Sequence, residues 1–154
     1  MKRYALLLAL AAGPAPAGDW TQFRGPAGTA VSEETGLPVK WSATENVRWK
    51  VELPERGNST PVVWGDRVFL TQATEKSTKR AVMCFARADG KLLWKQETEY
   101  TEKEPTHQTN PYCSGSPATD GERVVANLGS AGTVCYDMDG KELWRRDLGK
   151  MTAD

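Results

Sequence analysis

Apolar residues in this chain occur in short runs, and polar turns that contain glycine separate them. Within many of these runs apolar and polar residues alternate, which is typical of half-buried β-strands. The pattern predicts four strands in residues 59–97 and four more in residues 116–148, with the bounds 61–64, 67–72, 81–86, 91–97, 117–119, 123–128, 133–137 and 141–147. The stretch 75–80 is predicted to be a charged hairpin tip.

One stretch of the sequence occurs twice. The first copy runs from Cys84 to Trp94, and the second, one residue shorter, runs from Cys135 to Trp144. Each copy has cysteine and an aromatic residue at the end of an apolar run, then Asp-Gly-Lys, then Leu-Trp. This order predicts a strand, a tight turn and a second strand. The recurrence after about 50 residues indicates stacked units of one architecture.

The predicted fold is all-β, a partial β-propeller of four-stranded antiparallel blades. Blade one covers residues 59–97, blade two covers 116–148, and the polar stretch 98–115 connects them. Residues 47–53 alternate as a strand without three strands before them, so we expect them to close the last blade of the ring. Residues 18–46 are predicted to be an extended leader. Residues 149–154 would begin the connection to a further blade, as expected of an N-terminal fragment of a longer protein.

The repeated stretch resembles the motif A-x-D-x-x-T-G-x-x-x-W of the pyrroloquinoline-quinone-like (PQQ-like) propeller family, which includes exported propellers of the BamB type. In that family the indole packs between the small first residue of its own motif and the glycine peptide of the next blade, in rings of seven or eight blades. The resemblance implies this structural role for Cys84, Gly90, Trp94, Cys135, Asp137, Gly140 and Trp144. The shared position of Cys84 and Cys135 on neighbouring blades argues against a disulfide between them.

Residues 1–17 have the order of a secretory signal: a basic start, an apolar core and a small-x-small site that predicts cleavage after Ala17. The predicted location is therefore periplasmic or secreted. The apolar core is too short to span a bilayer, so no stable membrane insertion is expected. Lysine plus arginine and aspartate plus glutamate number 20 each. This balance argues against a nucleic-acid partner.

Two stretches carry candidate binding residues. In the leader, Trp20, Phe23 and Arg24 can anchor the arm on the edge of the fold, which we favour, or can form a ligand pocket. In the connector, His107, Asn110 and Tyr112 can face the central channel and hydrogen-bond a polar ligand. For His107, solvation or bracing of the loop is the commoner role of a lone histidine in a polar loop.

The chain offers no catalytic, cofactor-binding or metal-binding motif. Three functions stay open. A non-catalytic exported scaffold that binds protein is preferred. The alternatives are a PQQ-dependent alcohol or sugar dehydrogenase, which would need PQQ and calcium, and a module that binds carbohydrate or a surface polysaccharide.

Overall fold

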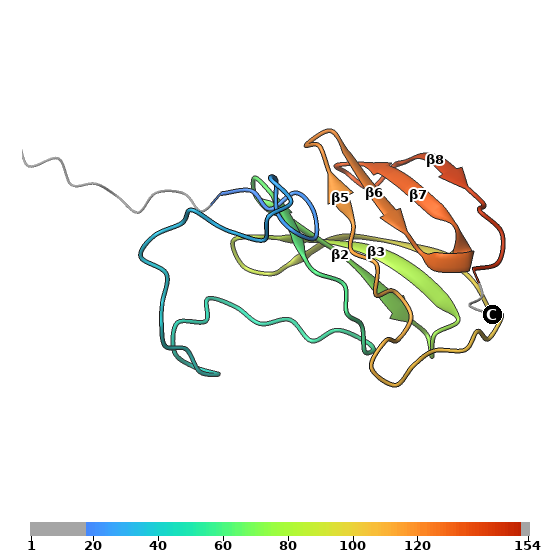
Figure 1. The fold of residues 1–154 in the computed structure, drawn as a ribbon, viewed down its shortest axis with the longest axis horizontal. Helices are drawn as coiled ribbons and strands as arrows, with labels where there is room; N and C mark the ends of the chain where they lie inside the picture. Colours follow the sequence, from blue (N-terminus) through green and yellow to red (C-terminus); the bar gives the residue numbers. More distant parts are fainter. Residues whose placement is uncertain (1–17, 152–154) are drawn as a thin grey trace, which may run out of the picture.

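The computed structural model describes residues 18–151. In these residues the chain forms two four-stranded antiparallel sheets and a single 3-10 turn, η1 (Gly129–Ala131). The all-β prediction of two propeller blades is therefore confirmed (Figure 1). The predicted signal at residues 1–17 and the last residues, 152–154, lie outside the described part of the chain.

The first sheet follows chain order, β1-β2-β3-β4, as a simple meander. Its strands are β1 (Val62–Trp64), β2 (Arg67–Thr74), β3 (Lys79–Ala86) and β4 (Leu92–Glu99). Cys84 stands directly opposite Trp94 in the β3–β4 ladder, and the ladder is irregular immediately after it, between Cys84 and Phe85. This irregularity is a β-bulge, which bends the strand just before the tight turn.

The second sheet repeats this arrangement in the order β5-β6-β7-β8. Its strands are β5 (Ala118–Thr119), β6 (Arg123–Asn127), β7 (Thr133–Asp137) and β8 (Glu142–Arg146). Cys135 stands opposite Trp144, and the ladder again shifts at the next residue, Tyr136. The repeat seen in the sequence is thus a structural repeat, including the position of its irregularity.

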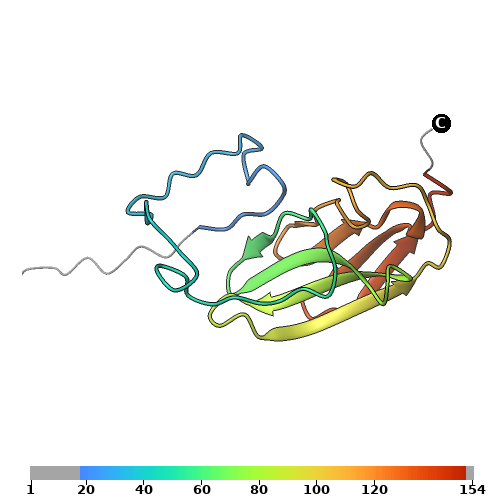
Figure 2. The ribbon, with the colours of Figure 1, turned by 90° about the horizontal axis from the view of Figure 1, so that it is seen from below.

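The hydrophobic core lies between the two sheets, which stack face to face (Figure 2). Alternation along β3 divides its side chains: Val82 and Cys84 face the second sheet, whereas Met83 and Phe85 belong to a separate cluster on the opposite face. From the second sheet the core includes Val124, Ala126, Val134 and Tyr136. Cys84 is fully buried in this core. Cys135 is also buried, but on the face of the second sheet that points away from the first. All three cysteines are free.

Residues 47–53 form no strand, although the alternating pattern predicts one. A strand needs a neighbour for its backbone hydrogen bonds, and no described segment pairs with this one. The segment nevertheless lies on the outer face of the first sheet, where Val51 packs against the apolar cluster of that face. Trp49 and Val51 are partly buried, as the alternation predicts, whereas Val47 and Leu53 are exposed.

Candidate functional site

Segments that are distant in the sequence meet where β1 and β5 begin and β4 ends. We call this surface the connector end, and it is made of residues 55–60, 75–78 and 100–116. The buried Thr71 hydroxyl donates a hydrogen bond to the Gly115 carbonyl oxygen at 2.6 Å. Nearby, the Asn58 amide donates to the Thr109 carbonyl oxygen at 2.8 Å. These bonds hold the long polar connector against the first sheet.

An open groove of ≈ 390 Å³ lies at the connector end. It is lined by Glu55, Arg56, Ser77, Thr106, Pro111 and Tyr112. The Glu55 carboxylate is engaged, because it accepts hydrogen bonds from the Ser77 amide at 2.9 Å and from the Ser77 hydroxyl at 2.6 Å. The exposed Arg56 guanidinium donates to the Gln108 carbonyl oxygen at 3.1 Å. The groove therefore presents one exposed guanidinium and one carboxylate whose two oxygens are already hydrogen-bonded.

Arg80 lies between two of the residues that line this groove. Its guanidinium carbon is 3.9 Å from the ring centroid of Tyr112, and its Nη1 donates to the Ser77 carbonyl oxygen at 2.6 Å. Only 2% of the residue is exposed. The sequence pattern placed Arg80 in the charged hairpin tip, and this is wrong because β3 begins at Lys79. The alternation of the strand could have predicted this burial, because residues two apart lie on the same face and Arg80 therefore shares a face with Val82 and Cys84.

The structure separates the three candidate residues of the connector. Tyr112 lines the groove, and its hydroxyl donates to the Glu104 carbonyl oxygen at 2.6 Å. His107 is exposed and outside the groove lining, and its Nδ1 lies 2.8 Å from the Thr109 hydroxyl. Asn110 is also exposed, and its amide donates to the His107 carbonyl oxygen at 2.9 Å. His107 and Asn110 therefore brace the loop in this structure.

The tight turns of the repeat contact tryptophans from the preceding segment. A β-carbon placed on Gly140 would lie 2.8 Å from Cδ2 of Trp94, whose indole nitrogen donates to the Met138 carbonyl oxygen at 2.9 Å. A β-carbon placed on Gly90 would lie 2.6 Å from Cε3 of Trp49. The Trp49 indole nitrogen donates to the Arg87 carbonyl oxygen of the same turn at 2.8 Å. Each indole thus occupies space that only a glycine leaves free.

Asp137 shapes the second of these turns. Its carboxylate accepts from the Asp139 amide at 3.0 Å and from the Lys141 amide at 2.9 Å. These bonds hold Gly140 at φ 86°, a left-handed conformation that favours glycine. The Arg67 side chain ties the turn to the first sheet, because it donates to the Met138 carbonyl oxygen and forms an ion pair with Asp139.

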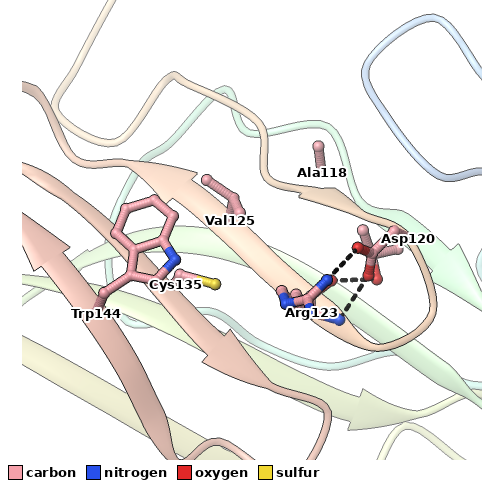
Figure 3. A pocket seen from close by; sticks show the side chains of 7 residues that line it. Ala118, Asp120, Arg123, Val125, Cys135 and Trp144 are labelled. Atoms are coloured by element: carbon pink, nitrogen blue, oxygen red, sulfur yellow. Dashed lines mark hydrogen bonds and ion pairs between the residues drawn. The ribbon is translucent and has the colours of Figure 1, made fainter.

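Trp144 has no such turn against it in the described residues and is 38% exposed. It lines an open groove of ≈ 270 Å³ on the second sheet, together with Cys135, Val125 and Ala118 (Figure 3). The ion pair between Arg123 and Asp120 closes one end of this groove. Cys84, in the corresponding place of the first sheet, is covered, and burial raises the pKa of its thiol to about 12.

The comparison with protein families agrees with this repeat geometry. Residues 23–153 match the family described as outer membrane protein assembly factor BamB. This chain belongs to that family. No curated protein sequence matches the chain. The match spans both sheets, the connector and most of the leader, so the groove at the connector end lies wholly within the family region.

In this BamB-family chain the leader is attached through Trp20. The amide and carbonyl of Trp20 form a two-way bridge with Val63 of β1, at 2.9 and 2.7 Å. The neighbouring Thr21 carbonyl accepts from the Thr119 amide of β5 at 2.9 Å. Phe23, by contrast, is 64% exposed, and Arg24 is exposed as well. The leader therefore contacts both sheets, the first through Trp20 and the second through Thr21, so only one of the three residues that we singled out takes part.

Within residues 18–151 no three histidine, cysteine, aspartate or glutamate side chains are close enough together to hold a metal ion. In the same residues no helix has the length and apolar character needed to cross a membrane.

Proposed function

We propose that this protein is an exported, non-catalytic propeller of the BamB family that binds a protein partner at its connector end. The observation that carries the proposal is the match to a family described as an outer membrane assembly factor, over nearly all of the described residues. The connector end supports it, because polar loops held on a rigid scaffold are where binding residues concentrate.

A site-specific photo-crosslinker tests the partner and the surface together. We would place the crosslinking residue at Thr106, which lines the groove, and in a matched variant at Glu122, in the β5–β6 turn at the opposite end. Irradiation of cells that produce the full protein is expected to give a discrete protein adduct from position 106 and none from position 122. Equal labelling at both positions, or adducts only with polysaccharide, would contradict the proposal.

Export is the second part of the proposal and rests on the pattern of residues 1–17. Mass spectrometry of the protein recovered from the periplasm or the medium is expected to give a mature chain that begins at Gly18. A full-length chain that starts at Met1 and stays in the cytoplasm would contradict export.

The non-catalytic assignment has its own test. The full protein is incubated with PQQ, calcium and an artificial electron acceptor, and dye reduction is followed with alcohols and sugars. We expect no turnover above that of the cofactor alone. Turnover that saturates with PQQ would overturn the scaffold proposal in favour of a quinoprotein dehydrogenase.

A further inference from the structure

Arg80 is a buried cation for which the described residues provide no counter-ion. Its Nη1 donates to the carbonyl oxygens of Ser77 and Lys79, at 2.6 and 3.3 Å. Its Nη2 is buried and has no hydrogen-bond partner. An arginine stays charged in proteins, and a buried charge without an anion or a full set of hydrogen bonds is costly. The site is therefore incomplete in a specific way: it lacks an acceptor at Nη2.

Two aromatic rings hold the guanidinium in place. Tyr112 stacks on it at 3.9 Å and Tyr100 lies at 5.6 Å, both measured to the ring centroid. Such cation–π contacts position a guanidinium and partly compensate its charge. They do not use the in-plane N–H groups, which are the groups that bind a carboxylate. Of these, Nη1 is bonded to the carbonyl oxygens of Ser77 and Lys79, and Nη2 has no acceptor. The missing acceptor is thus best supplied by a planar anion.

The groove beside Arg80 has the charge to attract that anion. Arg56 is exposed on its lining, and the single lining acid, Glu55, is occupied by the Ser77 amide and hydroxyl. No ion pair joins either arginine to an acidic residue in the described part of the chain. The groove therefore has two cations, Arg56 on its lining and Arg80 behind Tyr112, against one carboxylate, Glu55, whose oxygens already accept hydrogen bonds from Ser77.

We propose that the groove at the connector end binds a carboxylate of an acidic peptide segment, with Arg56 making the first contact and Arg80 completing the site. This inference rests on the proposed protein-binding function and names the chemistry of the partner. Tyr112 controls access, because its ring covers the guanidinium and its hydroxyl is tethered to Glu104 through the Glu104 amide and carbonyl, at 2.9 and 2.6 Å. Entry of the carboxylate displaces this ring and satisfies Nη2.

The test uses the full chain and two peptides with blocked ends, hexaglutamate and hexaglutamine, titrated by calorimetry. Hexaglutamate is expected to bind and hexaglutamine is not. Arg56→Gln should weaken hexaglutamate binding about tenfold, the loss of one charge-assisted hydrogen bond. Arg123→Gln removes the same charge at the opposite end, and it should leave the Kd within about twofold because screening limits distant charges. The Arg80 Nε–H signal in the NMR spectrum should shift during the titration of the wild-type chain. This measurement needs no Arg80 variant, which could fail to fold.

Three results would overturn the inference. These are no binding of hexaglutamate at millimolar concentration, equal weakening by the Arg56→Gln and Arg123→Gln variants, and binding that leaves the Arg80 signal unmoved. The two proposals fail separately. Crosslinking from position 106 without hexaglutamate binding would support the protein-binding function and overturn the carboxylate site. Hexaglutamate binding without any crosslinked protein would support the carboxylate site and overturn the protein-binding function.

Discussion

The contact between Trp94 and Gly140 joins the two sheets, and replacing Gly140 by alanine should break it. The new β-carbon would lie 2.8 Å from Cδ2 and 2.9 Å from Cγ of the indole. The indole is held by its hydrogen bond to Met138 and by Phe69 and Tyr136, whose ring centroids are each 5.9 Å away. These contacts restrict its movement away from the turn.

Two effects should lower the free energy of unfolding of the Gly140→Ala variant. The left-handed φ of 86° costs about 1–2 kcal/mol once a β-carbon is present, and overpacking against a fixed ring costs about 1–3 kcal/mol. Gly129→Ala is the matched control, because its φ is 69° but nothing lies within 4 Å of the new β-carbon. It should therefore lose only the conformational part, about 1–2 kcal/mol.

Urea unfolding of the full chain, followed by tryptophan fluorescence, measures both variants. A double-mutant cycle with Trp94→Ala isolates the clash, since in that background Gly140→Ala should cost no more than Gly129→Ala. If Gly140→Ala and Gly129→Ala lose equal free energy in the wild-type background, the indole does not press on the turn, and the account of the sheet-to-sheet contact is refuted.

Other predictions concern the thiols, an ion pair and the leader. Burial raises the pKa of Cys84 to about 12 and that of Cys113 to about 11, from 9.0, so both thiols should resist alkylation in the folded chain. The unfolded chain releases these protons first, so the free energy of unfolding should fall as the pH rises above about 9, and less steeply in Cys113→Ala. A folded chain alkylated as fast as an unfolded one would contradict this. Arg67→Met removes the bonds to Met138 and Asp139, and should cost about 1–3 kcal/mol in urea unfolding. Arg123→Gln removes the surface ion pair with Asp120 and should lower the free energy of unfolding by less than about 1 kcal/mol. Equal losses in Arg67→Met and Arg123→Gln would count against a role for Arg67 in joining the two sheets. Trp20→Ala should speed hydrogen exchange at the Val63 amide, which donates to the Trp20 carbonyl at 2.7 Å, whereas Phe23→Ala should not. Similar exchange in both variants would show that the leader is not attached through Trp20.

The strands were predictable because their signals are local. Period-two alternation and glycine turns placed all eight within a few residues of their bounds. The β2–β3 turn gave the weakest signal, since it uses Glu75, Lys76 and Ser77 at positive φ and contains no glycine. Without that marker the sequence made the hairpin tip too long and left Arg80 in it.

The groove could not be predicted from the sequence. It joins Arg56, Ser77 and Tyr112 from three segments, and their proximity depends on how the connector folds back over the first sheet. The closing strand expected over 47–53 stays a prediction, because a strand is formed only beside a partner and none of the described segments pairs with these residues. Trp49 still reaches Gly90, because that contact requires only the side-chain pattern.

The most direct test of the central claim is a nuclear Overhauser measurement on the labelled full chain. If the two sheets are successive blades joined through their tight turns, the indole ring protons of Trp94 will show strong cross-peaks to the α-protons of Gly140, and those of Trp49 will show the equivalent cross-peaks to Gly90. Assigned spectra that lack both sets of cross-peaks would contradict the account.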